Sequence, residues 1–185
     1  RDHACLPDVI SWHELNDDFF SGWYARYADY RAIESSLELP PREICINEYG
    51  RMHGDLGIPG KLVQWLARFE RSKVDACLAY WTDAGSLNNL VTRDNYNQAT
   101  GAWWLYRWYG GLTGDTLEVT PPDMNAEGLQ GLAAIDDSRK QARILLGGCG
   151  GGVTLRLQGF DAVPFFGSLV HLTDWETTSF LLRQS

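Results

Sequence analysis

The segment REICINEYG, residues 42–50, is predicted to be a buried strand around Ile44, Cys45 and Ile46, and it ends in Glu48, Tyr49 and Gly50. A charged side chain at the end of an apolar run is costly unless it is paired, solvated or used. A carboxylate in such a place can act as a nucleophile, as an acid or base, or as a metal ligand. Glu48 is therefore the first candidate for a functional residue.

Two further apolar runs end in the same way. Residues 9–12 are followed by His13 and Glu14, and residues 74–81 end in Trp81, with Asp83 just after it. In folds built from βα units, the catalytic groups lie at the C-terminal ends of the strands and on the loops that follow them. We therefore expect the ends of all three runs to meet at one edge of a sheet.

The elements that must position these ends alternate along the first part of the chain. Apolar residues at helical spacing separate the three strand-like runs. Strands that are apolar on both faces are typical of a parallel sheet covered by helices, so this part is predicted to be α/β. The expected strands are residues 9–12, 42–47 and 74–81, and the expected helices are residues 23–37, 61–71 and 100–109.

The composition changes near residue 112, where short alternating runs joined by turn residues begin. Such runs predict antiparallel strands and half or more of a β-sandwich. The run GGCGGG, residues 147–152, lacks the Lys-Ser/Thr of a phosphate-binding loop and is interpreted as a hairpin connection. The expected strands lie in residues 116–122, 129–137, 141–148, 153–160 and 167–175.

The charge and amino-acid composition argue against several classes of function. The net charge of −8 without a basic stripe argues against nucleic acid as a partner. No apolar run approaches the ~18 residues of a membrane span, and the four cysteines show no zinc-like spacing. We expect no cofactor and no metal. The eight Trp, eight Tyr and seven Phe supply the usual platforms for sugar rings.

The motifs INEYG, YW and PDVISWHEL, with the β-rich segment after them, resemble the clan A retaining glycoside hydrolases, nearest to the β-xylosidase and α-L-iduronidase-like branch. The resemblance matches Glu48 to the nucleophile at the end of barrel strand seven. It matches His13 to a strand-six residue near the nucleophile, and Trp81 to the strand-eight tryptophan of the sugar subsite. It implies a partial (β/α)8 TIM-barrel segment over residues 1–112 and a β-sandwich accessory domain over residues 113–185.

The same resemblance implies an enzyme that cleaves glycosidic bonds in an oligo- or polysaccharide with retention, and it favours an extracellular or periplasmic location. A closed barrel takes roughly 250 residues, so an N-terminal barrel half that carries the acid/base is expected to be missing. The isolated chain is then expected to be inactive and to expose strand edges. Glu14 follows His rather than Asn, so it is not given the acid/base role. Together with Tyr49 it is a candidate substrate contact.

Other interpretations stay open at this point. The chain could be a non-catalytic carbohydrate-binding relative of these enzymes. Glu14, Glu48 and His13 could instead hold a metal, although their spacing matches no known metal motif. Glu48 could also be a structural residue, paired with Arg51. The long polar loop after Trp81 supplies further possible substrate contacts, namely Asp83, Asn88 and Asn89.

Overall fold

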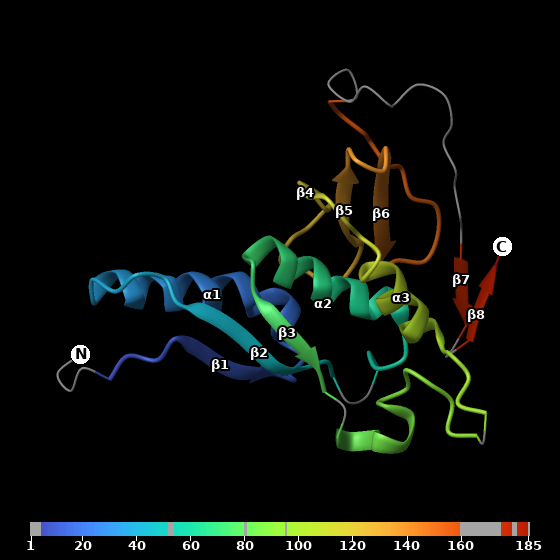
Figure 1. Ribbon diagram of the computed structural model, residues 1–185, viewed down its shortest axis with the longest axis horizontal. Helices are drawn as coiled ribbons and strands as arrows, with labels where there is room; N and C mark the ends of the chain where they lie inside the picture. Colours follow the sequence, from blue (N-terminus) through green and yellow to red (C-terminus); the bar gives the residue numbers. More distant parts are fainter. Residues whose placement is uncertain are drawn as a thin grey trace.

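The computed structural model describes residues 5–51, 54–79, 81–94, 96–159, 175–178 and 181–184. Strands and helices alternate in its first part, as the sequence predicts (Figure 1). No helix among these residues is long and apolar enough to cross a lipid bilayer. In chain order the elements are β1 (Val9–Glu14), α1 (Phe19–Ser36), β2 (Glu43–Tyr49), α2 (Pro59–Ser72), β3 (Asp75–Leu78), the 3-10 helix η1 (Trp81–Ser86) and α3 (Gly101–Tyr109).

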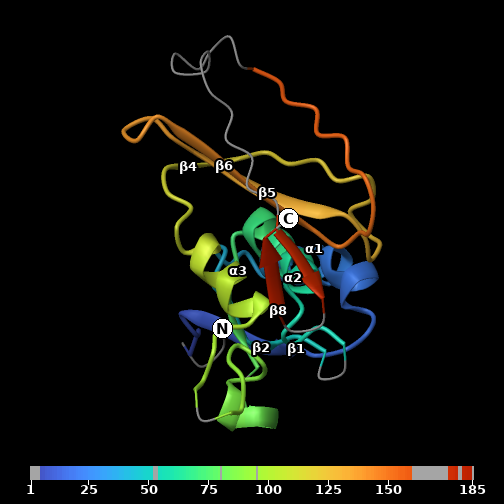
Figure 2. The same cartoon turned by 90° about the vertical axis from the view of Figure 1, so that its right-hand side faces the viewer.

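The first three strands form a parallel sheet in the order β1-β2-β3. The helices lie on one side of this sheet, as two perpendicular views show (Figures 1 and 2). Successive side chains of a strand point to opposite faces, so each strand presents one set of residues to the helices and another away from them. We call these the covered face and the open face. Ile44, Ile46 and Tyr49 lie buried on the covered face, whereas Val9 and His13 are exposed on the open face.

An aromatic cluster fills the space between the covered face and the helices. The rings of Phe19 and Trp65 stack with centroids 3.8 Å apart, and Trp23 and Phe69 pack around them. Large aromatic rings in contact stabilise a core beyond the area that they bury. The helical spacing of apolar residues over residues 23–37 predicts one buried stripe, but the last turns of α1 extend beyond the sheet (Figure 1), so Ile33 is 50% exposed.

The second part of the chain forms an antiparallel sheet of β4 (Asp115–Leu117), β5 (Gln130–Asp136) and β6 (Gln141–Gly147). This sheet packs on α2, which therefore lies between two sheets (Figure 1). A separate hairpin consists of β7 (Trp175–Thr178) and β8 (Leu181–Gln184). The β-sandwich and the boundary between residues 112 and 113 stay predictions.

One expected strand of this region is wrong. Residues 153–159 form no strand, and their apolar side chains are exposed, because no described strand lies beside them to pair with. The glycine run at residues 147–152 is therefore not the turn of a hairpin. Most of the expected strand at residues 167–175 lies outside the described residues.

Two arginines of α2 join the first part of the chain to the second. Arg68 is fully buried and donates hydrogen bonds to the carbonyls of Met124 and Ala126, 3.0 and 2.8 Å away. Burial lowers the pKa of Arg68 to about 10. Arg71 donates to the carbonyl of Val119 at 3.3 Å and to the side-chain oxygen of Gln130, in β5, at 2.9 Å. Buried carbonyls need donors, so these arginines satisfy the main chain of the connection between β4 and β5.

Candidate functional site

A β-bulge at the end of β2 determines where Glu48 points. Trp12 pairs with Ile46, but the next residue of β1, His13, pairs with Glu48, so Asn47 is an extra residue in β2. If the pairing were regular, Asn47 would lie opposite His13, and Glu48 would lie one position further along β1, opposite Glu14 on the covered face. A bulge commonly re-aims a side chain next to a functional site. Here it places Glu48 on the open face, beside His13.

The open-face pair is close enough for direct interaction. His13 Nδ1 lies 3.6 Å from Glu48 Oε2, and the pair is ionic when the imidazole is protonated. The Glu48 side chain is 20% exposed and that of His13 is 50% exposed. A carboxylate in this setting can be reached by a ligand and can act as nucleophile, base or hydrogen-bond acceptor.

Glu14 follows His13 but points to the covered face. Its carboxylate is buried and accepts hydrogen bonds from Trp12 Nε1 at 2.8 Å and from Arg26 at 3.2 and 2.7 Å. Arg26 thus neutralises a charge that would otherwise be costly to bury. Glu14 does not converge with His13 and Glu48, and no group of three possible metal ligands occurs in the described part of the chain.

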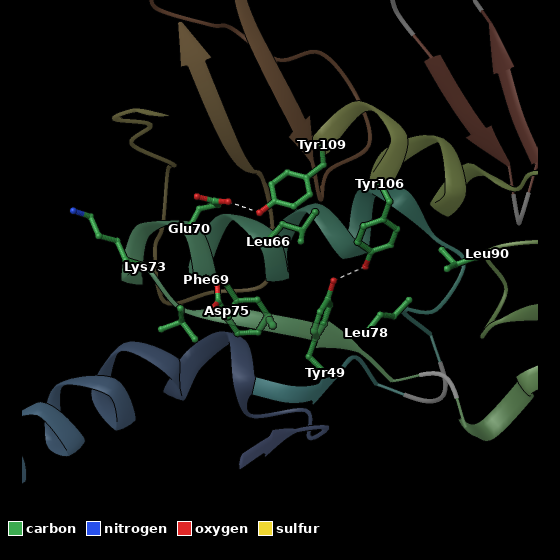
Figure 3. A pocket seen from close by; sticks show the side chains of 12 residues that line it. Tyr49, Leu66, Phe69, Glu70, Lys73, Asp75, Leu78, Leu90, Tyr106 and Tyr109 are labelled. Carbon is green, nitrogen blue, oxygen red and sulfur yellow. Dashed lines mark hydrogen bonds between the residues drawn. The ribbon is translucent and has the colours of Figure 1, made fainter. Parts of the chain in front are cut away.

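Tyr49 also lies on the covered face, with its neighbour Glu48 on the other side of the sheet. Its hydroxyl is 2.5 Å from that of Tyr106 on α3 (Figure 3), and burial raises its pKa well above the usual value. Both rings line a cavity of about 600 Å³ between β3, α2 and α3. Tyr109 donates to Glu70 at the rim of this cavity (Figure 3). The structure therefore separates Glu14 and Tyr49 from the pair that they were expected to join.

In the alternative in which Glu48 is a structural residue, Arg51 would be its partner, yet Arg51 pairs with other carboxylates. Its guanidinium donates to Asp55 at 2.8 and 2.7 Å, and to Glu127 at 3.1 and 3.0 Å. Gly50 makes the turn into this loop with φ +106°, where a side chain would meet Leu56. Sequence reasoning missed the role of Asp55, and its only signal was a charge in the middle of a glycine-rich turn.

The loop after β3 carries the remaining candidates. β3 ends at Leu78, before the expected residue 81, and Trp81 begins η1 three residues later. The side chain of Trp81 lies outside the described residues. Asp83 pairs with Arg93 at 2.6 Å, and hydrogen bonds from Arg93 lower the pKa of Asp83. Asn88 is fully buried, donates to the carbonyl of Ala79 and accepts from the main-chain N–H of Asp83 at 2.7 Å. Asn89 donates to the carbonyl of Leu56 at 3.4 Å. These contacts fold the loop back on itself and on its neighbour.

Comparison with known proteins places the chain beside glycosidases. No protein-family model matches it. It is 42% identical over 171 residues to a 3-O-α-D-galactosyl-α-L-arabinofuranosidase of Bifidobacterium longum subsp. longum, and 39% identical over 180 residues to a 3-O-β-L-arabinopyranosyl-α-L-arabinofuranosidase of Bifidobacterium pseudocatenulatum. The matches cover 86% and 89% of this chain but only 15% and 18% of the length of those enzymes.

A solved structure shows the same fold. The structure of N2152 from Neocallimastix frontalis superposes with a TM-score of 0.73 at 36% identity, over 82% of this chain and 38% of that one. The chain is therefore similar to one part of larger proteins, and the two enzymes that it resembles are glycoside hydrolases. The narrower resemblance to the β-xylosidase and α-L-iduronidase-like branch of clan A stays a prediction.

Proposed function

We propose that this chain is part of a retaining glycoside hydrolase in which Glu48 is the nucleophile. The observation that carries the proposal is the bulge that brings Glu48 beside His13 on the open face. The names of the two glycosidase relatives support the same class of reaction. In this proposal Glu14 and Tyr49 hold the ends of β1 and β2 from the covered face instead of contacting the substrate.

The sheet is the wall of an incomplete barrel in this proposal. A doubly wound fold reverses its strand order and has helices on both faces, whereas a barrel adds strands in sequence with all helices outside. The observed order β1-β2-β3 and the helices on one face favour the barrel (Figure 1). In the described part the outer edges of β1 and β3 are unpaired, so further strands could be added at either side. The open face would then line the interior.

The proposed reaction has two steps. The Glu48 carboxylate attacks the anomeric carbon while a second carboxyl group protonates the leaving oxygen, and a glycosyl ester of Glu48 forms. Water, deprotonated by the second group, then cleaves this ester and restores Glu48, so the anomeric configuration is retained. The second carboxyl must lie roughly 5–5.5 Å from the first. Glu14 cannot supply it from the covered face, so we assign this role to the missing barrel half.

The substrate class follows from the two relatives. Both names describe the release of a 3-O-glycosylated α-L-arabinofuranosyl unit. We therefore propose an α-L-arabinofuranoside with a sugar substituent on O-3 as the substrate, within an oligo- or polysaccharide. Trp81, at the end of β3, is the proposed platform for a sugar ring, because aromatic faces pack well on the apolar side of pyranose and furanose rings.

A mechanism-based reagent tests the assignment. The protein used is the longer enzyme, which is this chain together with the proposed barrel half. It is incubated with a dinitrophenyl 2-deoxy-2-fluoro-α-L-arabinofuranoside, and the digested protein is analysed by mass spectrometry. We expect the fluorosugar on the peptide that contains Glu48, and no label after Glu48→Gln. His13→Gln is the matched control, since it changes the neighbour but keeps the nucleophile and should slow labelling without moving it. A label on any other residue, or glycan binding without turnover that survives Glu48→Gln, would reject the assignment.

A further inference from the structure

Arg51 connects four segments around the end of β2. It is the second residue after the strand, and its guanidinium binds Asp55 and Glu127 through two hydrogen bonds each. The same group lies 3.6 Å from Asp17, in the loop after β1, and 4.8 Å from the ring centre of Phe20, at the start of α1. One side chain thus contacts the loops that follow both strands of the candidate pair.

Burial makes this arrangement rigid. Asp55 is fully buried and also accepts hydrogen bonds from Trp65 Nε1 at 2.9 Å and from the main-chain N–H of Arg51 at 3.2 Å. A buried carboxylate is stable only when its oxygens are satisfied in this way. Paired bonds between a guanidinium and a carboxylate also fix the relative orientation of the two planes. Arg51 therefore has little freedom to move away from the end of β2.

The second partner of Arg51 comes from the other part of the chain. Glu127 lies in the connection between β4 and β5, 76 residues after Arg51 in sequence. Hydrogen bonds from Arg51, and then from Lys61, lower the pKa of Glu127 to about 2, so its carboxylate is ionised at any ordinary pH. The segment that precedes β5 thereby reaches across to the loop that follows Glu48.

We infer that Arg51 and Glu127 are positioning residues that hold the end of β2, and with it Glu48, in the orientation needed for attack. This inference rests on the proposed function of Glu48. It also gives the second part of the chain a role in the reaction, because Glu127 lies in the connection that leads into β5. Displacement of a reacting group by about 1 Å can cost roughly 100-fold in rate. Loss of Glu127 leaves Arg51 bound to Asp55, so the strand end should be released only in part. The rate of attack by Glu48 should then fall by about tenfold.

The test uses the fluorosugar reagent above on the longer enzyme. Glu127→Gln should lower the maximal rate of Glu48 labelling about tenfold while the half-saturating reagent concentration changes less than about twofold, because the anchor does not touch the sugar. Arg51→Lys should lower this rate at least as much, because it also loses the paired bonds to Asp55. The double variant should be no slower than Arg51→Lys alone, since that change already breaks the pair with Glu127. Lys61→Gln is the matched control. It also removes an ion pair of Glu127 but leaves Arg51 bound, and it should stay within about twofold of the unaltered enzyme.

Amide hydrogen exchange supplies a readout that does not depend on turnover. Peptides covering residues 44–51 should exchange faster in Glu127→Gln than in Lys61→Gln, whereas peptides from β6 should not differ. Equal labelling rates at Glu48 in all variants would overturn the positioning role, even if exchange increased, since the anchor would then be structural only. Labelling of the unaltered enzyme at another residue would instead overturn the proposed function.

Discussion

The two faces of the β1–β3 sheet carry neighbouring residues with opposite properties. On the covered face, Glu14 is buried against Arg26 and Tyr49 is buried against Tyr106. On the open face, the residue that precedes each of them is solvent-accessible, and these two residues contact each other across the strands. Alternation along a strand separates residues that adjoin in sequence. Two carboxylates near the ends of neighbouring strands therefore have different environments, and only Glu48 can be reached from the open side.

The largest expected effect on stability appears when one side chain is truncated on each face. Ile46→Ala removes a fully buried side chain and leaves a cavity against the helices, so it should lower the free energy of unfolding by about 3–4 kcal/mol. Val9→Ala on the open face removes a side chain that is 44% exposed and should cost less than about 0.5 kcal/mol in this chain. Urea unfolding followed by tryptophan fluorescence measures both values.

The same two variants, made in the longer enzyme, test whether the open face is covered there. If further barrel strands cover the open face, the cost of Val9→Ala should rise there to about 1 kcal/mol or more, because the side chain would be buried. The cost of Ile46→Ala should not change, since its surroundings are already complete. Equal and small costs of Val9→Ala in both proteins would argue that this face stays open to solvent.

A smaller effect on stability is expected when either of the two carboxylates, Glu14 or Glu48, is replaced by an amide. Glu14→Gln leaves Arg26 without its charge partner and should destabilise the chain by about 2 kcal/mol, less than a fully buried pair because the Arg26 side chain is 35% exposed. Glu48→Gln, the matched change on the open face, should alter stability by less than about 0.5 kcal/mol and abolish labelling by the fluorosugar. A large loss of stability in Glu48→Gln would show that Glu48 is a structural residue.

The sequence was sufficient for much of the first part of the fold. Periodicity located all three strands and helices of the βα succession, because long apolar patterns are strong local signals. It failed at residues 153–159, where alternation alone indicated a strand. A strand needs a partner beside it, and the presence of a partner is a property of the whole fold.

The candidate site was predictable only in part. Strand-end reasoning singled out His13 and Glu48, which the structure brings together, but it grouped Glu14 with them on the wrong side of the sheet. The bulge at Asn47 has no local sequence signature, yet it reverses the direction of the following side chain. The pairing of Arg51 with Glu127 joins residues far apart in sequence, so no spacing rule could have found it.

The smallest effect concerns the aromatic end of the covered face. Tyr49→Phe keeps the ring in the core but removes one member of the hydrogen-bonded hydroxyl pair. The buried hydroxyl of Tyr106 then loses its partner. Such a loss should cost about 1 kcal/mol. Tyr106→Phe should cost a similar amount, and the double variant should cost less than the sum, because both changes break the same bond. Additive costs would show that each hydroxyl finds another partner in the cavity and that the bond does not tie the end of β2 to α3.

Fluorosugar labelling of Glu48 should change less than about twofold in Tyr49→Phe, since only the covered face is altered. A tenfold loss would instead mean that the two faces of the strand end act together.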